Sequence, residues 1–275
     1  MSTTMQEFLK NSLVAEKVCL VDNTDSKTIE NPYSSVPTAT VSGITGTYTI
    51  GNWTSTDDTL TVDHQITVSE HVYGFEDILA HADTYADRME KHMYAVSLAI
   101  DVWVINNLCE DATGTYSTPS GGFTTASNIL TIMANLGSKF GGYANPFQAP
   151  FLIIENTDMV GFTIAGATNG YNFADAYLNN GFMNDFMGFK IYVVRASTFK
   201  DETATSVSGT LTWTNSGHRV AGLTGIASYA SPRNIQYEEK SVSGQLGKEI
   251  VTSCLIGFKA WTNMAGLLID ITVTA

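Results

Sequence analysis

DILAHADTYADRMEKHMYAVSLAIDVWVINNLCEDATG, residues 77–114, carries the strongest helical pattern in the chain. Apolar side chains recur at spacings of three and four residues, which is the period of one helix face. They are Tyr85, Met89, Met93, Val96, Ile100, Trp103, Val104 and Leu108. Acidic residues crowd the first turns, where the helix dipole favours them, and Gly114 follows the end. The pattern predicts one helix of about 30 residues and about 45 Å, which is typical of an elongated molecule.

Two strands around a polar turn are predicted before this helix. In residues 59–68, TLTVDHQITV, apolar and polar side chains alternate, which is the period of a half-buried strand. The run expected to face it, residues 38–50, is rich in Thr and Gly. Because an isolated two-stranded hairpin is marginally stable in water, this arm is expected to lie on something else.

The part of the chain after the helix predicts a compact α+β lobe. A Gly/Ser/Thr-rich loop leads to a helix at residues 128–141 and an apolar strand at residues 150–156. A second apolar strand is predicted within residues 187–197, and Gly-bounded strands follow at residues 255–261 and 266–275. The predicted fold class is therefore α+β.

Composition limits the function classes. The chain has 275 residues, 44% of them hydrophobic, so it can bury a sizeable core. Its net charge of -13 makes any contact with DNA weak and non-specific and disfavours a membrane surface. The first residues lack the apolar segment of a signal peptide, and Asp101 interrupts the most apolar helical run. Cys19, Cys109 and Cys254 are far apart and odd in number, which favours reduced thiols.

The charges are unevenly distributed. No Lys or Arg occurs from Thr28 to Asp87, whereas nine acidic residues do. Eight of the 14 basic residues lie in the last third: Lys190, Arg195, Lys200, Arg219, Arg233, Lys240, Lys248 and Lys259. Two interpretations stay open, a solvated acidic face and charge complementarity between copies of the chain.

No catalytic motif is present. GxSxG, HExxH and GxGxxG are absent, and GQLGKE at residues 244–249 has the wrong spacing for a phosphate-binding loop. His64 and His71 with Asp63 and Glu70 could form a metal cluster, but His64 shares an alternating strand face with apolar residues, which favours a packed or interface histidine. We therefore predict no catalytic residue, metal site or cofactor. A hydrolase using His64 or His71 is the weakest alternative, since no nucleophile pairs with either.

The order of these elements resembles the major capsid proteins of tailed double-stranded DNA bacteriophages, the Hong Kong 97 fold. An N-terminal arm, a Thr/Gly-rich two-stranded loop, the acidic lead-in VSEHVYGFEDI at residues 68–78, one long helix and a compact lobe precede LGKEIVTSCLIGFKAWTNMAGLLIDITV at residues 246–273. The sequence GFK, at residues 188–190 and 257–259, is a further mark. The resemblance covers the whole chain and concerns the order of its elements and the composition of its segments.

The resemblance implies a domain division. The expected parts are an N-terminal arm at residues 1–35, an E-loop at 36–70, a peripheral domain at 71–116 and 231–275 with a spine helix at about 78–112, and an axial domain at 117–230. In the family, the E-loop reaches over a neighbouring subunit. That habit would explain an arm without its own core.

The function implied is structural. The chain would form homo-hexamers and homo-pentamers of an icosahedral capsid around phage DNA, in a virion assembled in the host bacterial cytoplasm. A portal, a separate scaffolding protein and, in some relatives, decoration proteins would be its partners. No Lys lies between Lys27 and Lys91, so a covalent link through an E-loop lysine is not expected. Only about 30 residues precede the E-loop, so neither a built-in scaffold nor its cleavage is expected.

A subunit contact is predicted at the E-loop tip. Trp53, Asp57 and Asp58 would meet basic residues of a neighbouring copy. The candidate partners are Arg219, Arg233 and Lys240. Two other functions stay open: an encapsulin, which is a cellular compartment of the same fold, and a β-rich surface or adhesion module.

Overall fold

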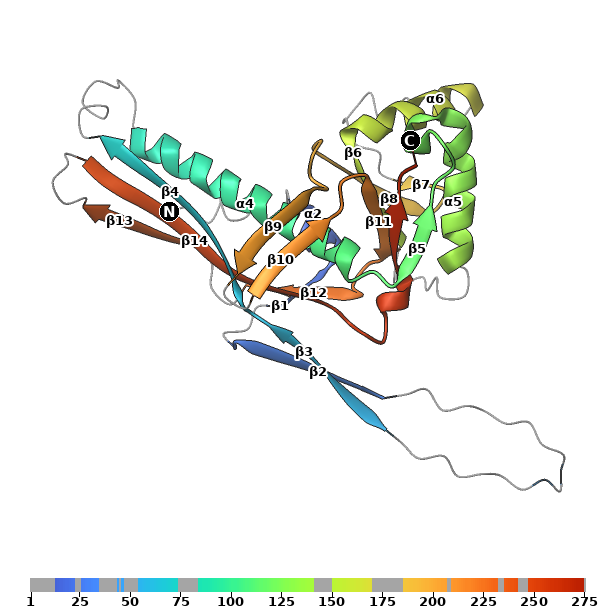
Figure 1. Cartoon of the computed structure of the whole chain (residues 1–275), viewed down its shortest axis with the longest axis horizontal. Coiled ribbons are helices and arrows are strands. Elements are labelled where there is room, and N and C mark those ends of the chain that lie inside the picture. The colour runs from blue at the N-terminus through green and yellow to red at the C-terminus, as the bar shows by residue number, and fades with distance from the viewer. Residues whose placement is uncertain are drawn as a thin grey trace.

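The computed structural model of the chain has two large β-sheets joined by one long helix, and two smaller two-stranded sheets (Figure 1). It describes residues 13–22, 26–34, 44, 46, 54–73, 84–140, 150–169, 185–206, 209–231, 235–241 and 247–274. One sheet lies along the first part of the long helix, and the other lies at its C-terminal end (Figure 1). The predicted α+β class is confirmed.

The long helix, α4, spans Thr84–Glu110. Six of the eight residues of its predicted apolar face are buried: Met93, Val96, Ile100, Trp103, Val104 and Leu108. Met89 is half-buried, and the side chain of Tyr85 lies outside the described part of the chain. The predicted start at about residue 78 lies outside the described residues. At the other end the helix stops two residues before the predicted boundary, and the carboxylate of Asp111 accepts a hydrogen bond from the Ala260 amide at 3.3 Å.

The first sheet is centred on the long strand β14, Gly247–Ala260. β4 (His64–Tyr73), β13 (Gln236–Ser241) and β12 (Ala227–Ala230) pair with it antiparallel, and β1 (Leu20–Asp22) extends the sheet beside β12. α4 packs on the face that carries Ile250, Cys254 and Ile256. The buried ring of His92 lies 3.3 Å from both Thr252 Oγ1 and Glu70 Oε2, and so ties helix to sheet.

The predicted pairing of residues 38–50 with 59–68 is wrong. β3 (Ser55–Thr61) pairs with β2 (Thr28–Ser34), and the next strand, β4, belongs to the first sheet. The alternating run is therefore two strands with different partners, separated by Val62 and Asp63. Residues 38–50 lie outside the described residues except for Ile44 and Gly46.

The second sheet is mixed, in the order β5-β15-β11-β6-β8-β7. These strands are Gly114–Ser117, Leu268–Thr272, His218–Leu223, Pro150–Glu155, Phe189–Val194 and Asp185–Phe186. The predicted strands at 150–156, 187–197 and 266–275 thus exist. However, β5 and β15 pair with each other in this sheet, whereas both were expected in the peripheral domain. Chain order could not reveal this pairing, because the two strands are about 150 residues apart.

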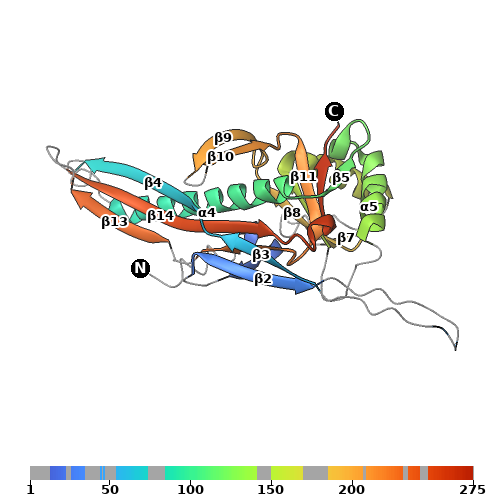
Figure 2. The same ribbon diagram turned by 60° about the horizontal axis from the view of Figure 1, so that its bottom comes forward.

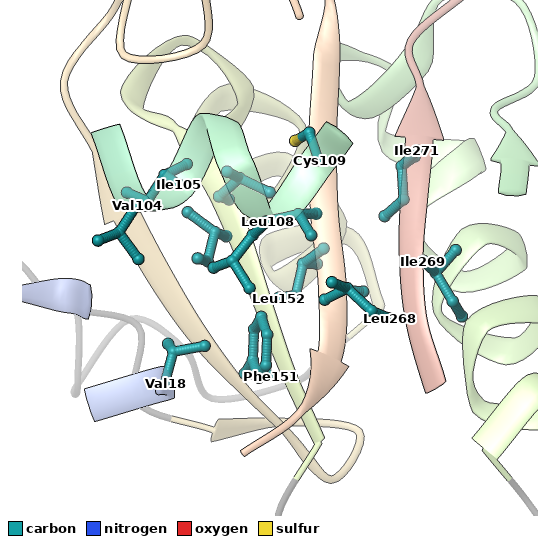
Figure 3. Packing of buried hydrophobic residues seen from close by; sticks show 14 of the residues in the cluster. Val18, Val104, Ile105, Leu108, Cys109, Phe151, Leu152, Leu268, Ile269 and Ile271 are labelled. Atoms are coloured by element: carbon teal, nitrogen blue, oxygen red, sulfur yellow. The ribbon is translucent and has the colours of Figure 1, made fainter. Parts of the chain in front are cut away.

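The main core lies between this sheet, its helices and the end of α4. The helices are α5 (Ala126–Phe140), which matches the helix predicted at 128–141, and α6 (Met159–Asn169). Leu108 and Ile105 of α4 point toward Phe151, Leu152 and Leu268 of the sheet (Figure 3). One continuous core therefore joins the second sheet to the helix that supports the first.

The N-terminal helix α2, Val14–Val18, is capped by a residue of α4. The carboxylate of Asp101 accepts hydrogen bonds from the amides of Val14 (3.2 Å) and Ala15 (2.9 Å), while Leu13 at the N-cap makes no side-chain cap. Burial raises the pKa of Asp101 to about 6, although these hydrogen bonds act in the opposite direction. The segment is thus part of the folded body.

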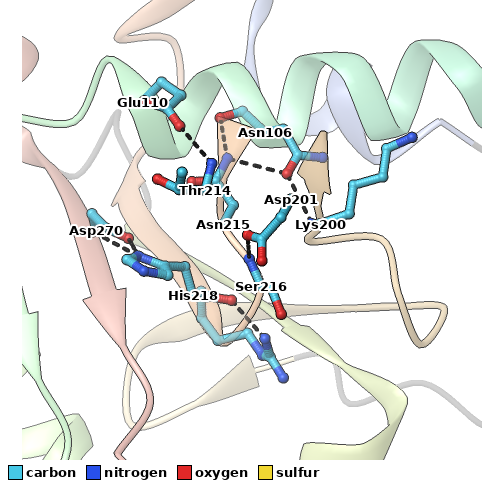
Figure 4. A network of polar contacts seen from close by, with 10 residues as sticks. Asn106, Glu110, Lys200, Asp201, Thr214, Asn215, Ser216, His218 and Asp270 are labelled. Carbon is cyan, nitrogen blue, oxygen red and sulfur yellow. Dashed lines mark hydrogen bonds and ion pairs between the residues drawn. The ribbon is translucent and has the colours of Figure 1, made fainter. Parts of the chain in front are cut away.

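A separate hairpin projects beside α4. It consists of β9 (Asp201–Ser206) and β10 (Gly209–Thr214), and it lies on the opposite side of α4 from β2 and β3 (Figure 2). Its base is held by buried Asn106, whose Oδ1 accepts hydrogen bonds from the Lys200 amide (3.2 Å) and from Asn215 Nδ2 (3.1 Å) (Figure 4). Asn106 Nδ2 also donates to the Thr198 carbonyl at 2.8 Å.

Two further predictions concern cysteines and membranes. All three cysteines are buried and unpaired. Within the described ranges, no helix has the length and apolar character needed to cross a membrane.

We predict that Leu108→Ala lowers the free energy of unfolding by about 2–5 kcal/mol, because Leu108 is fully buried and the cavity cannot collapse between helix and sheet. Denaturant unfolding followed by circular dichroism measures this. Tyr94→Ala on the same helix is the control, since Tyr94 is 57% exposed and its loss should cost about 0.5 kcal/mol or less. Equal costs would show that the helix face is assigned wrongly.

Candidate interaction site

The β2–β3 ribbon, residues 28–34 and 55–61, has two different faces. In its register, Ile29 lies opposite Leu60 and Asn31 opposite Asp58, and these side chains are buried or half-buried. Glu30, Pro32 and Asp57 lie on the other face and are exposed. The first set faces the body of the protein and the second faces solvent, as the alternation of a strand requires.

A small apolar cluster fixes the base of the ribbon. Leu60 and Val62 pack with Ala230 of β12 and Trp261, and half-buried Ile29 joins them. The Trp261 indole N–H donates to Ser228 Oγ at 3.0 Å. This cluster is separate from the main core. The ribbon is thus held by few apolar contacts of its own.

Asp58 adds a directional contact to this cluster. Its Oδ2 accepts a hydrogen bond from the Thr262 backbone amide at 2.8 Å, and Lys259 Nζ lies 3.4 Å from its Oδ1. Burial alone would raise the pKa of Asp58, but the Thr262 hydrogen bond and Lys259 outweigh it, so the pKa lies below its ordinary value. Asp58 is therefore a charged clamp between the ribbon and the end of β14.

Gly257 lets the ribbon approach β14 closely. A Cβ at this position would lie 2.5 Å from the Thr61 carbonyl oxygen and 2.8 Å from Val62 Cα. Both atoms belong to backbone and cannot rotate away. The chain therefore crosses β14 here, between β3 and β4, only because position 257 has no side chain.

The two acidic residues of the predicted contact lie on opposite faces of the ribbon, which corrects that prediction. Asp57 and Asp58 were expected to act together at a tip, but Asp57 faces solvent, whereas Asp58 is 8% exposed and bound within its own chain. The period of two in STDDTLTV places residues 58, 60 and 62 on one face, and this signal could have separated the two acids. Trp53 lies outside the described residues.

Arg219 is also wrong as a partner for a neighbouring copy. It is 6% exposed, its Nε donates to Asp158 Oδ2 at 2.5 Å, and its Nη2 donates to Glu155 Oε2 at 3.2 Å. Nη1 donates to the His218 carbonyl, and the guanidinium lies over the Phe199 ring at 5.2 Å. Such a buried group is satisfied internally and is not available to a second molecule.

The other two predicted partners are Lys240 and Arg233. Lys240 lies on β13 and is exposed, and its Nζ is 3.2 Å from Glu238 of the same strand. An exposed pair of this kind is weak, so it can exchange partners. Arg233 lies outside the described residues.

His64 and His71 pack against aromatic rings. His64 Nδ1 lies 2.5 Å from Asp63 Oδ1, and its ring packs on Trp103 with centroids 5.0 Å apart. His71 packs edge-on against Tyr73 at 4.4 Å. In the part of the chain that the structure describes, no hydrogen bond joins either ring to a hydroxyl or thiol, and no group of three His, Cys, Asp or Glu could hold a metal ion. These contacts fit the packed histidine that the strand pattern favoured.

No protein-family model matches the chain, and no curated protein matches it either.

Structural comparison is informative. The chain resembles the capsid structure of the cyanophage P-SCSP1u with a TM-score of 0.73, at 11% identity, over 96% of this chain and 88% of that one. It also resembles the mature capsid of bacteriophage PhiM1 (TM-score 0.63, 11% identity, 94% and 85%) and the capsid of a native GTA particle (0.62, 11%, 95% and 90%). The chain therefore has the fold of phage capsid proteins, and the predicted Hong Kong 97-like fold is confirmed.

We predict that Asp58→Asn lowers the free energy of unfolding at pH 7 by about 1–3 kcal/mol, because the charged acceptor for the Thr262 amide is lost. Since the folded-state pKa of Asp58 is depressed, its contribution is present above the unfolded value of about 4 and disappears as the pH falls through the lower folded value. The difference between parent and variant should therefore shrink below about pH 4.

Denaturant titrations at a series of pH values measure this difference. The matched control is Asp57→Asn, which changes an exposed carboxylate one residue away. A loss of stability that is the same at pH 3 and pH 7 would contradict an ionised clamp.

Proposed function

We propose that this chain is a major capsid protein, which self-assembles into hexamers and pentamers of an icosahedral shell around phage double-stranded DNA. The observation that carries the proposal is the likeness over nearly the whole chain to capsid structures, with TM-scores of 0.60 to 0.73. The role is structural and the chain acts in the virion. A 27-residue helix and a mixed fold do not suit a β-rich adhesion module.

The β2–β3 ribbon supports self-association. It is two-stranded, leaves the body, and has a polar and exposed outer face (Figure 1). A ribbon of this kind gains little stability from its own chain, since isolated two-stranded pairs are marginal in water. Its open strand edges can be stabilised by a surface of a second copy.

The domain division that we propose is revised from the sequence. The N-terminal arm remains at residues 1–35, although its last strand, β2, contributes to the ribbon. The E-loop ends near Val62 instead of residue 70, because β4 belongs to the first sheet. The peripheral domain contains that sheet and α4. The axial domain contains the second sheet, including β5 and β15.

The ribbon contact that we propose involves Asp57, with Glu30 on the same exposed face and Trp53 as an apolar anchor. Lys240 and Arg233 of a neighbouring copy are its partners. Asp58 and Arg219 are no longer included, because both are bound within their own chain. Each exposed pair contributes only about 0–1 kcal/mol, but a closed shell repeats it in every subunit.

Other partners follow from the same proposal. Portal, scaffolding and decoration proteins would meet the assembled shell in the host bacterial cytoplasm. Contact with packaged DNA would be weak and non-specific, because the net charge of -13 repels phosphate. The absence of Lys between Lys27 and Lys91 leaves burial, strand pairing and charge to hold neighbouring copies together.

We predict that the purified chain forms closed shells that electron microscopy can detect. A variant that joins Ser34 to Ser55 through Asn-Gly, in place of residues 35–54, should fold but form no shells. Ser34 and Ser55 are directly opposite in register, so a two-residue turn can close the ribbon.

The outcomes separate the claims. Failure of the parent chain to form particles under any assembly condition, including co-expression with its scaffold, would contradict the capsid proposal. Normal shells from the shortened variant would contradict only the E-loop assignment. Nucleic acid inside native particles supports a phage capsid, whereas DNA-free particles that hold an enzyme would identify an encapsulin.

We predict that Asp57→Lys slows shell formation at low salt without changing the melting temperature of the subunit, because Asp57 is exposed on the ribbon. Salt should partly rescue assembly by screening the new repulsion. Light scattering at several ionic strengths measures this. Thr59→Gln on the same face is the uncharged control for bulk. Assembly of Asp57→Lys at the parental rate would favour a merely solvated acidic face.

A further inference from the structure

The residue that Asp58 holds lies in the connection between the two sheets. β14 of the first sheet ends at Ala260, and β15 of the second sheet begins at Leu268. Thr262 lies in the seven residues between them, and its amide is the donor to Asp58. Residues 261–267 are called the sheet joint below, because they connect the two sheets. Asp58 therefore links the ribbon to the sheet joint as well as to Lys259 of β14.

Other elements converge on the same joint. The Ala260 amide donates to Asp111 just after α4, and the Thr113 amide donates to the Ala265 carbonyl at 3.4 Å. The Trp261 amide donates to the Ile226 carbonyl, 3.2 Å away, in the turn that links β11 of the second sheet to β12 of the first. The β14–β15 connection, the β11–β12 connection and the C-terminal end of α4 thus lie close together, beside the contact between Asp58 and Thr262.

The apolar cluster cannot fix the direction of the ribbon by itself. Contacts among Leu60, Val62 and Trp261 are non-directional, so they allow the ribbon to tilt about its base. A seven-residue strand is about 23 Å long, and a tilt of about 10° at its base moves the far end by about 4 Å. A displacement of that size is enough to miss a contact on another molecule. The hydrogen bond of Asp58 has the direction that the cluster lacks.

We infer that Asp58 is a positioning residue, which sets the angle of the β2–β3 ribbon to the two sheets and couples that angle to the joint at Thr262. The inference rests on the proposed self-assembly and goes beyond it. When a neighbouring copy holds the ribbon, the clamp passes that restraint to the joint, so both sheets take the orientation that the next contact needs. Asp58 thus matters more for assembly than for folding.

The angle can be measured directly in the subunit. Ser34→Cys and Ala134→Cys place spin labels on the exposed ribbon and on the exposed face of α5. The three native cysteines are buried, so labelling is selective. Pulsed electron paramagnetic resonance should give one narrow distance distribution in the parent and in Asp57→Ala. In Asp58→Ala the distribution should broaden by about twofold or more, because the directional contact is lost.

Assembly gives the second measurement. Under conditions in which the parent forms shells, Asp58→Ala should reduce the shell yield by about tenfold or more, whereas Thr59→Ala, at an exposed position of the same strand that is not part of the proposed contact, should change it by about twofold or less. Asp58→Asn, which keeps an acceptor for the Thr262 amide but loses the charge, should lie between them. This graded order is not expected if Asp58 has only a general packing role.

Three results would overturn the inference. An unchanged distance distribution in Asp58→Ala would show that the cluster alone sets the angle. Parental shell yield from Asp58→Ala would show that the angle does not govern assembly, while the capsid proposal would stand. An unfolded Asp58→Ala subunit, seen by circular dichroism, would place Asp58 in the folding core. If the parent itself forms no shells, the capsid proposal fails first, and the distance measurement still tests the clamp.

Discussion

The packing of one helix against two sheets determines the architecture of this protein. α4 presents a single apolar face along its length, and that face covers the first sheet and then enters the core of the second. The helix contacts strands of both sheets, so it is a shared support for the two. Its buried polar residues follow the same logic, because His92 bonds to the first sheet and Asn106 to the base of a hairpin beside the second.

The ribbon is stabilised differently from the main core. A core gains stability by removing apolar surface from water, whereas the ribbon has to leave the body and keep a defined direction. A small cluster, one charged hydrogen bond and one glycine achieve this at its base. All three features lie where the chain crosses β14. The ribbon residues Asp58, Leu60 and Val62 therefore depend on partners about 200 residues later in the chain.

Local periodicity in the sequence predicted many of the helices and strands of the fold. The long helix, the helix at 126–140 and the strands that follow it are visible in the sequence, because their patterns depend only on which side faces the core. Strand partners were predicted poorly. The pairing of β3 with β2, and of β5 with β15, depends on residues far away in the chain, and alternation says nothing about them. Arg219 failed for the same reason, since its partners Glu155 and Asp158 are about 60 residues away.

The β9–β10 hairpin has a practical consequence. Its described residues between Glu202 and Trp213 include no charged side chain, and its base is mounted on the saturated hydrogen bonds of Asn106. A foreign peptide inserted between the two strands would therefore leave the core and the sheet joint intact. If many copies of the chain form one particle, such an insertion would be repeated once in every subunit, at a spacing that the shell itself fixes.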